Sequence, residues 1–337
     1  MQILLSNKFL QGMAAFLLIL AVSVPGRTLA EVEGIAVTLD NDMFVGEDNG
    51  YTNGIYLSWW DGPEGKQVAE PGLLARAMLW SLPKSDAPGV AIKTVGQVMV
   101  TPEDIEEDPP ILPPDDLPYA GLLFYADTWV QVHDSFADKV SVRIGIVGEY
   151  SFAQEAQETV HEIIGADEPC CWDTQLDDEI VFQFGRGRIW ESWVSDSGHT
   201  DLLLGVDLEL GTITSSAGVS MMIRYGRDLE QTFASVLLVN SRTTNPVASE
   251  TGWYVFAGAR AGYLANQIFL DGSKSYDDDY DEIDYDEEIL AVTTGLAYSW
   301  NDLSLTFALN NLNVNENDDS AEKYSEYGTI TVALKLD

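Results

Sequence analysis

Positive charge is what this sequence has least of, because 17 lysines and arginines stand against 55 aspartates and glutamates, for a formal net charge of −38. This balance excludes a nucleic-acid site of the usual basic kind. An acidic surface repels polyanions unless divalent cations lie between the two. A more general explanation is that acidic surfaces keep a protein soluble in saline surroundings. We therefore expect no nucleic-acid partner.

Cysteine and histidine are also scarce. The only two cysteines, Cys170 and Cys171, are adjacent and cannot join distant segments. A disulfide between neighbours is possible but strained, so we expect two loop thiols without a catalytic role. No Cys/His cluster has the spacing of zinc ligands. The sequence also lacks G-x-S-x-G, H-E-x-x-H and Walker A motifs, so a serine triad is unsupported.

Long apolar runs are missing after the first thirty residues. Residues 1–30 predict a secretory signal, with Lys8 in the basic part and Met13 to Val24 as the apolar part. Small Ala30 precedes the predicted cleavage point, so the mature chain is expected to start at Glu31. No later segment offers the roughly 18 apolar residues that a spanning helix needs. A membrane location would therefore require a β-barrel.

Strand-length stretches of alternating apolar and polar or small residues run through the rest of the chain. Residues 138–149, 200–212 and 303–313 show the pattern clearly. A period of two with one apolar face is typical of a half-buried strand. A soluble β-sandwich gives the same alternation, but charges such as Arg143 and Glu209 on the opposite face favour a membrane barrel with a wet lumen.

The expected fold is all-β: a single transmembrane antiparallel β-barrel of about 12 strands over residues 31–337, with both termini periplasmic. Connections are expected to alternate between short and long, since residues 301–302 form a tight turn while residues 271–285 and 313–325 are long and polar. Phe233 to Val239 could be a further strand or part of a periplasmic connection. The expected strands are 34–43, 51–61, 93–101, 118–133, 138–149, 177–190, 200–212, 216–227, 252–265, 286–300, 303–313 and 326–336.

One segment departs from this pattern, because residues 151–176 predict a short helical insert followed by loop in an outer connection. Ser151 is a candidate N-cap, with Gln154 closing a capping box. Gln154, Gln157 and His161 recur at spacings of three and four and therefore share one helical face. Such a polar face, held above the barrel mouth, could serve as a general-base platform. A lone helical histidine does not by itself establish catalysis.

Oxygen ligands gather where the first two strands meet one rim. The first strand ends in Asp40 to Asp42, and the second begins with Tyr51 to Gly54. Consecutive up and down strands place both at the same outer rim. Asp and Asn side chains with loop carbonyls suit Ca²⁺, and a bound cation could polarise an ester carbonyl. The same residue types favour turns, so turn chemistry is an equal explanation.

A set of short motifs follows a fixed order along most of the chain. They are Asn41-Asp42, Tyr51-Thr52-Asn53-Gly54, Gly96-Gln97, Thr101-Pro102-Glu103-Asp104, Asp116-Leu117-Pro118-Tyr119-Ala120-Gly121, Ile146-Val147-Gly148, Gln154, Gln157 and His161 through Gly165, Trp172, Gln175-Leu176, Phe256-Ala257-Gly258 and Ile268-Phe269-Leu270-Asp271-Gly272. In this combination and order, the chain resembles the lipid A 3′-O-deacylase family of outer-membrane proteins.

The resemblance implies a twelve-stranded bacterial outer-membrane barrel with its site between lumen and outer leaflet. It implies Ca²⁺-dependent hydrolysis that removes the 3′-linked acyloxyacyl chain from lipid A of lipopolysaccharide. By the same resemblance, His161 activates water and Asp167 supports the site. Asn41, Asp42 and Thr52 would build the cation and oxyanion region, with Asn41 and Asp42 as metal ligands. The expected partners are lipopolysaccharide and outer-membrane lipids, and the expected state is a monomer.

One departure from the family pattern keeps two alternatives open. The loop Glu103 to Glu107 is acidic and lacks the lysine that some members carry after the Thr-Pro motif. The first alternative is a non-catalytic outer-membrane barrel that kept the fold and lost the activity. The second is a phospholipase-like esterase that acts on a different lipid.

Overall fold

The predicted secretory signal, residues 1–30, lies outside the residues that the structure describes, as does the ambiguous segment Phe233 to Val239. Within the described part of the chain, no helix combines the length and the apolar character needed to cross a bilayer. A computed structural model of the protein describes residues 32–44, 50–62, 69–102, 105, 117–164, 169–229, 232, 251–272, 285, 287–313 and 326–336.

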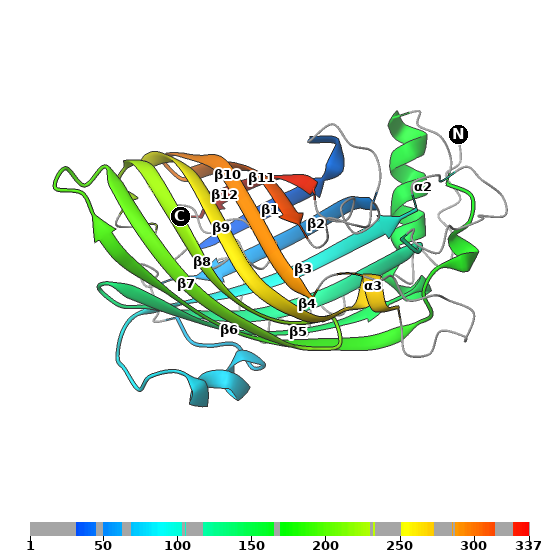
Figure 1. Ribbon diagram of the computed structural model, residues 1–337, viewed down its shortest axis with the longest axis horizontal. Coiled ribbons are helices and arrows are strands. Elements are labelled where there is room, and N and C mark those ends of the chain that lie inside the picture. The colour runs from blue at the N-terminus through cyan, green and yellow to red at the C-terminus, as the bar shows by residue number, and fades with distance from the viewer. Residues whose placement is uncertain are drawn as a thin grey trace.

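Twelve antiparallel strands form one closed barrel, in which neighbours in sequence pair and β1 pairs with β12 (Figure 1). This confirms the predicted fold. Strand bounds differ most at β3 and β6. β3 begins four residues earlier than predicted, at Gly89, because residues 89–92 pair with residues 128–131 of β4, and β6 ends four residues later, at Val194. The strands are β1 Gly34–Asn41, β2 Gly50–Asp61, β3 Gly89–Thr101, β4 Ala120–Val132, β5 Phe136–Val147, β6 Glu179–Val194, β7 Thr200–Gly211, β8 Thr214–Arg227, β9 Thr251–Gln267, β10 Glu288–Trp300, β11 Leu303–Asn313 and β12 Glu326–Lys335.

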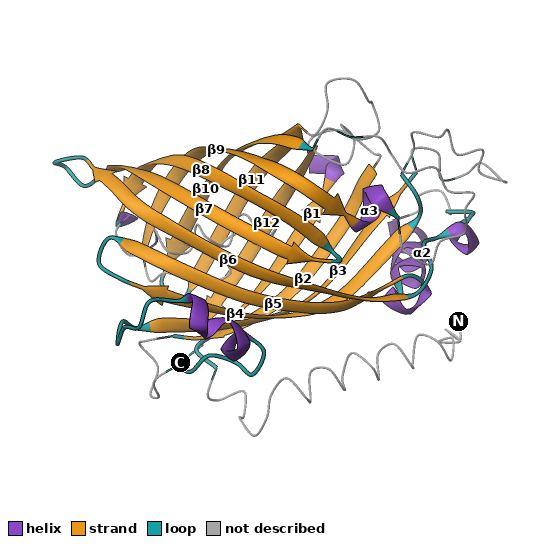
Figure 2. Ribbon diagram, turned by 60° about the horizontal axis from the view of Figure 1, so that its bottom comes forward, coloured by secondary structure: helices purple, strands orange, loops and turns teal. Residues whose placement is uncertain are grey.

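The helices are short and lie in the connections (Figure 2). They are η2 Asp42–Phe44, η3 Ala75–Ser81, η4 Glu149–Ser151, α2 Ala153–Ile164, η5 Trp172–Thr174 and α3 Ile268–Asp271. Because the strands alternate in direction, α2, α3 and η2 share one end of the barrel, which we call the α2 end. The other end, which we call the terminal end, holds the start of β1, the end of β12 and η3.

The expected alternation of short and long connections is wrong in three places. At the terminal end, residues 62–88 separate β2 from β3, and residues 228–250 separate β8 from β9. At the α2 end, β7 and β8 are joined by residues 212–213 alone. Loop length is not set by the period-two pattern of the flanking strands, so the pattern could place the strands without fixing which end carries the longer loops.

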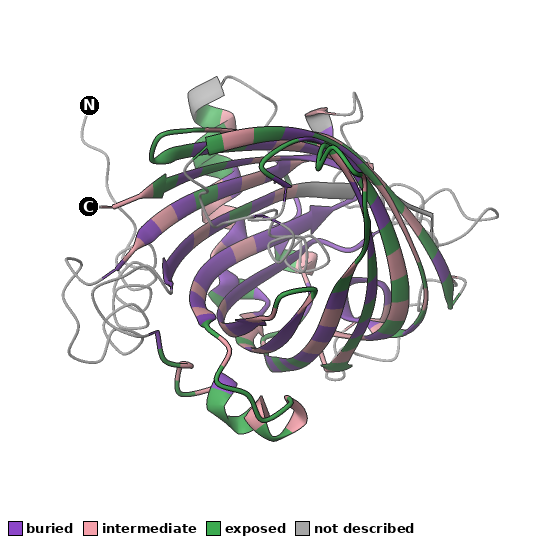
Figure 3. Ribbon diagram, turned by 90° about the vertical axis from the view of Figure 1, so that its left-hand side faces the viewer, coloured by how far each residue is buried: buried purple, intermediate pink, exposed green. Residues whose placement is uncertain are grey.

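Buried and exposed residues alternate along the strands of the barrel wall (Figure 3). Outward-facing Val206, Leu208 and Val219 are 41%, 42% and 58% exposed, as expected for a surface that meets lipid. Inward-facing polar residues are buried and paired, as in the hydrogen bond of 2.9 Å between the hydroxyls of Thr38 and Thr331. The alternation seen in the sequence therefore separates a lipid-facing surface from a packed, polar lumen.

A buried ion pair helps to close the terminal end. Arg224 and Asp201 have no exposed side-chain surface, and Arg224 Nε donates to Asp201 Oδ1 at 3.0 Å. Arg224 also donates to the Thr232 hydroxyl at 2.9 Å and to the Leu229 carbonyl at 3.0 Å. The start of the connection after β8 is thereby held against the inner face of the wall.

Candidate active site

The helix α2 begins after a sharp reversal of the chain. Gly148 has a φ of +97° and Phe152 a φ of +59°, with the single turn η4 between them. A left-handed conformation at a non-glycine residue costs about 1–2 kcal/mol. Because the Ala156 amide donates to the Phe152 carbonyl at 3.2 Å, the first turn of α2 starts from this strained residue.

The capping box expected at the start of α2 does not form. The Ser151 hydroxyl accepts a long hydrogen bond from the Ala153 amide at 3.4 Å, with Phe152 in between. The Gln154 side chain donates to Glu158 Oε1 at 2.8 Å instead of reaching back to Ser151. The S-x-x-Q pattern was a wrong signal here, because Phe152 is left-handed and the helix begins one residue later than predicted, at Ala153.

The helix α2 packs on the outer face of the wall, at the α2 ends of β3 and β4. Gln97 pairs with outward-facing Ile55, and its side-chain amide donates to the Ser151 carbonyl at 2.7 Å. Two residues on, Met99 joins Ala153 in one buried apolar cluster. The expectation that the helix is held above the barrel mouth is therefore wrong, because its apolar start is buried against the lipid-facing side of the wall.

Gly121 on β4 allows this close approach. A Cβ at Gly121 would overlap the Ser151 hydroxyl and the Ala153 methyl group. Gly121→Ala is therefore expected to push α2 off the wall, at an overpacking cost of about 1–3 kcal/mol. We expect cleavage within α2 to be about tenfold faster in limited proteolysis of the folded barrel.

The matched control for this prediction is Gly198→Ala, at the terminal end, where an added Cβ would have no atom within 4 Å. That change strains only its own turn and should leave α2 protected. Equal protection of α2 in Gly121→Ala and the wild-type protein would contradict the prediction.

A return segment after α2 fixes the helix from its other side. The indole Nε1 of Trp172 donates to Gln157 Oε1 at 2.7 Å, and both side chains are buried. The Trp172 ring contacts Tyr119, with ring centroids 5.0 Å apart. His161 follows Gln157 by one helical turn and is half-buried on the same face. The Trp172 contact therefore orients the face that carries His161.

The adjacent cysteines lie in this return segment and form a disulfide, so the prediction of two free thiols is wrong. Cys171 is buried beside Tyr119 and Trp172. The Cys170 amide donates to the Ile105 carbonyl at 2.8 Å, which joins the segment to the loop after β3.

The rim residues lie at the same end of the barrel. Asn41 ends β1 opposite Gly328 of β12, and Asp42 begins η2. Phe44 of η2 lies over Gly328 on the outer wall and contacts Phe307 edge-on at 6.4 Å between ring centroids. The rim half of the predicted site therefore also borders the outer wall.

The structure brings the two predicted halves to adjoining parts of one wall. The helix α2 packs on β3 and β4, whereas η2 packs on β12 and β2. Thr52 lies on β2, between the two halves, but its side chain is outside the described part of the structure. Asp167 and nearly all of Glu103 to Glu107 also lie outside the described residues.

The rim carries oxygen donors of the kind that suit a hard cation. Asp42 is only 2% exposed, whereas on β1 the side chains of Asp40 and Asn41 lie on the lumen side and the outer side of the wall. Burying carboxylates is costly unless hydrogen bonds or a cation compensate the charge. In the described ranges, no three His, Cys, Asp or Glu side chains converge as a metal site. Further ligands would have to be amide, hydroxyl or carbonyl oxygens, which Ca²⁺ accepts.

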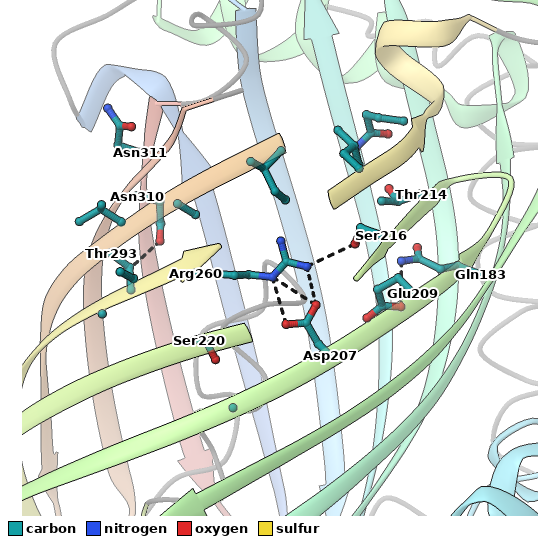
Figure 4. Close-up of a pocket in the computed structure, with 18 of the residues that line it drawn as sticks. Gln183, Asp207, Glu209, Thr214, Ser216, Ser220, Arg260, Thr293, Asn310 and Asn311 are labelled. Carbon is teal, nitrogen blue, oxygen red and sulfur yellow. Dashed lines mark hydrogen bonds and ion pairs between the residues drawn. The ribbon is translucent and has the colours of Figure 1, made fainter. Parts of the chain in front are cut away.

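A large cavity lies elsewhere, in the lumen (Figure 4). Its charged residues are paired: Arg260 Nε donates to Asp207 Oδ1 at 3.0 Å, and Glu209 accepts from Gln183 at 3.0 Å. Lys139 lies 3.9 Å from Glu209. None of the predicted site residues lines this cavity. We interpret these charges as a network that joins the inner faces of the strands.

The sequence profile of the family described as "Outer membrane protein LpxR" matches residues 13–336. The chain belongs to this family. The solved structure of LpxR from Salmonella typhimurium is similar, with a TM-score of 0.72 and 16% sequence identity, over 90% of this chain and 100% of that one. No curated protein sequence matches the chain.

More distant barrels match with lower TM-scores. The KdgM porin matches at 0.38 with 6% identity, over 90% of this chain and 99% of that one. The translocator domain of autotransporter NalP from Neisseria meningitidis matches at 0.39 with 10% identity, over 98% of each chain.

As an LpxR-family member, the protein is an outer-membrane barrel, so its exposed apolar wall faces lipid. With both termini periplasmic, as the sequence predicts, the α2 end would lie at the outer leaflet. The structural residues that sequence reasoning left without a role are Gly121 and Trp172. The small size of Gly121 was the available signal, since glycine permits close backbone approach.

Proposed function

We propose that this LpxR-family protein is a Ca²⁺-dependent outer-membrane esterase. Its substrate is lipid A, from which it removes the 3′-linked acyloxyacyl chain, and its general base is His161. The observation that supports this most strongly is the place of α2 on the outer wall. The face with Gln157 and His161 is held against strands whose outer surface meets acyl chains. A lipid ester reaches such a face laterally, without entering the lumen.

The chemistry requires a water molecule, a base and stabilisation of an oxyanion. The imidazole of His161 accepts a proton as water attacks the ester carbonyl, and returns it to the departing sugar hydroxyl. The products are a free 3′-hydroxyl and an acyloxyacyl carboxylic acid. Asn41 and Asp42 would hold Ca²⁺, with Thr52 in the same region. When bound, Ca²⁺ would polarise the carbonyl and stabilise negative charge on its oxygen.

The direct test is mass spectrometry of lipid A from cells that express the protein, compared with cells that carry the empty vector. We expect the wild-type protein, with Ca²⁺ present, to produce lipid A that lacks the mass of one acyloxyacyl chain. EDTA should prevent this loss. An unchanged acyl count with Ca²⁺ present would contradict the proposal.

Two other outcomes correspond to the alternatives that the acidic Glu103 to Glu107 loop leaves open. Hydrolysis of glycerophospholipids with lipid A untouched would indicate a phospholipase-like esterase. No hydrolysis of either lipid by a correctly folded barrel would indicate a non-catalytic protein that kept the fold.

Trp172→Phe is expected to lower the rate of acyl release about tenfold while the barrel stays folded. The phenyl ring keeps most of the contact with Tyr119 but donates no hydrogen bond to Gln157. A buried acceptor left without its donor costs about 1–3 kcal/mol, and the turn that carries His161 loses its orientation. The rate is measured on purified lipid A, and the barrel fold by heat-dependent gel mobility.

The control for Trp172→Phe is Trp80→Phe, because Trp80 is 83% exposed at the terminal end. It should leave the rate unchanged. Equal rates for Trp172→Phe and the wild-type enzyme would show that the Gln157 contact does not orient the helix.

A further inference from the structure

The outer wall of β5 and β6 carries three charged side chains: Asp138, Arg186 and Arg188. Their direction follows from the strand register. Arg186 pairs with Leu208, which is 42% exposed on the lipid-facing surface, and Asp138 pairs with Arg188 on the same face. A charge on the lipid face of a barrel is destabilising toward the bilayer midplane, so these residues require an explanation.

The three groups form a compact unit with an excess of positive charge. Asp138 has no exposed side-chain surface. It accepts two hydrogen bonds from Arg188, from Nε to Oδ1 at 2.9 Å and from Nη2 to Oδ2 at 2.8 Å. Arg186 donates to the same carboxylate. Two guanidinium groups thus share one carboxylate, which leaves a net charge of about +1 by simple charge counting.

Both guanidinium groups remain accessible from the membrane side. The side chains of Arg186 and Arg188 are 22% and 27% exposed. Arg188 is stacked on aromatic rings, with its Cζ 4.7 Å from the centroid of Phe136 and 5.8 Å from that of Trp190. These rings hold Arg188 in place while its outer edge stays available to an anion.

The unit lies near the terminal end, which is the periplasmic boundary of the membrane. Asp138 is two residues from the start of β5, next to the connection of residues 133–135. Phe136 and Trp190 flank it, and aromatic side chains are typical of the membrane–water boundary. Arginine costs little at this depth, where lipid headgroups are within reach.

An apolar surface patch formed by η3 and the residues just before it, which we call the η3 shelf, lies beside this unit. Ala75 of η3 packs with Trp129 and with Val140, the next outward residue after Asp138 on β5. Asp127 Oδ2 holds the shelf by accepting from the Leu74 amide at 2.9 Å and the Ala75 amide at 3.2 Å.

The same shelf presents apolar side chains at this boundary. Leu73 and Trp80 are 82% and 83% exposed, the largest exposures among the described large apolar residues. An aromatic ring and an aliphatic side chain at this depth fit the headgroup and upper acyl region of one leaflet.

We propose that Asp138, Arg186 and Arg188 bind the phosphate of an anionic glycerophospholipid in the periplasmic leaflet. Guanidinium groups match phosphate geometry and form charge-assisted hydrogen bonds with it. The excess positive charge stands out on a chain with a net charge of −38, which elsewhere repels anions. The unit faces the bilayer, so a lipid phosphate is the anion it meets. This site is separate from the proposed lipid A site at the opposite end.

The experiment is native mass spectrometry of the full-length purified barrel with phosphatidylglycerol or phosphatidylcholine added in detergent. We expect the wild-type protein to retain phosphatidylglycerol about tenfold more than phosphatidylcholine, the effect of one charge-assisted contact. Arg186→Gln is the key variant. It removes the excess charge but leaves Asp138 fully paired with Arg188, so the fold is not stressed. This variant should retain both lipids about equally.

Two further variants test the direction of the charge effect on lipid preference and provide a control. Asp138→Asn removes the negative charge and should keep or increase the preference for phosphatidylglycerol. Arg76→Gln removes an arginine at the same end, on η3, which is paired one to one with Glu70 at 2.9 Å, and should change nothing. The sequence thus provides a matched control for charge alone.

The proposal fails if the wild-type protein shows no preference for phosphatidylglycerol, or if Arg186→Gln keeps the preference in full. It also fails if inorganic phosphate at millimolar concentration displaces the lipid, which would indicate a site for free phosphate. If Asp138→Asn does not fold, the comparison of Arg186→Gln with Arg76→Gln still tests whether the preference for phosphatidylglycerol depends on Arg186. None of these readouts depends on hydrolysis of lipid A.

Discussion

His161→Ala is expected to lower the rate of acyl-chain release from lipid A by about 10²- to 10⁴-fold, the range that a general base contributes. The imidazole is the group that accepts the proton from water, and no other histidine lies on α2. The variant should fold normally, because His161 is half-buried at the surface of the helix, while the buried anchors of α2 are Ser151, Gln157 and Trp172.

The measurement is the rate of release from purified lipid A with Ca²⁺ present, followed by mass spectrometry. The matched control is Glu162→Ala, which changes the next residue, on an exposed face of the same helix. It should retain the wild-type rate. If His161→Ala released the chain at the wild-type rate, His161 could not be the base. If both variants lost activity together, the helix rather than the histidine would be responsible.

Ca²⁺ removal is expected to have an effect of similar size. EGTA should abolish acyl release, and added Ca²⁺ should restore it. Asp42→Asn replaces a carboxylate with a neutral amide of the same shape. We expect this variant to need about 10- to 100-fold more Ca²⁺ for half-maximal rate, because ligand charge tunes calcium affinity. Its rate at saturating Ca²⁺ should recover in part.

The control for Asp42→Asn is Asp302→Asn, in the tight turn between β10 and β11 at the opposite end of the barrel. It removes the same charge and should leave the Ca²⁺ requirement unchanged. Full activity in EGTA, or an unchanged Ca²⁺ requirement in Asp42→Asn, would show that the rim residues do not hold a catalytic cation.

The strands were predictable because the alternation of apolar and polar residues indicates which side of the wall each side chain faces. Leu204, Val206 and Leu208 alternate with Gly205, Asp207 and Glu209, and the structure places the two sets on opposite faces. Short-range periodicity therefore gave the strands, and the charges on their opposite face favoured a membrane barrel over a soluble sandwich. It could not give the full length of β3, because residues 89–92 extend that strand by pairing with β4.

Signals that depend on backbone conformation were less reliable. The serine at 151 carried a capping pattern, but a left-handed Phe152 shifted the start of α2. Only a few backbone angles separate a helix capped by Ser151 from one that begins after Phe152. Contacts with β3 and β4, rather than local preference, set these angles. The disulfide between Cys170 and Cys171 was missed because a bond between adjacent cysteines is strained, which favoured the prediction of two free thiols.

The sequence by itself determined a twelve-stranded outer-membrane barrel, a histidine-bearing helix in one connection and an oxygen-rich rim on the first two strands. Only the tertiary structure decided that this helix lies on the lipid-facing wall, through Gly121 and Trp172. It also decided that Asp138, Arg186 and Arg188 meet on that wall at the opposite end. Alternation along one strand determines which face a side chain occupies. Which charges and helices meet across strands depends on barrel closure and register, which bring together residues far apart in sequence.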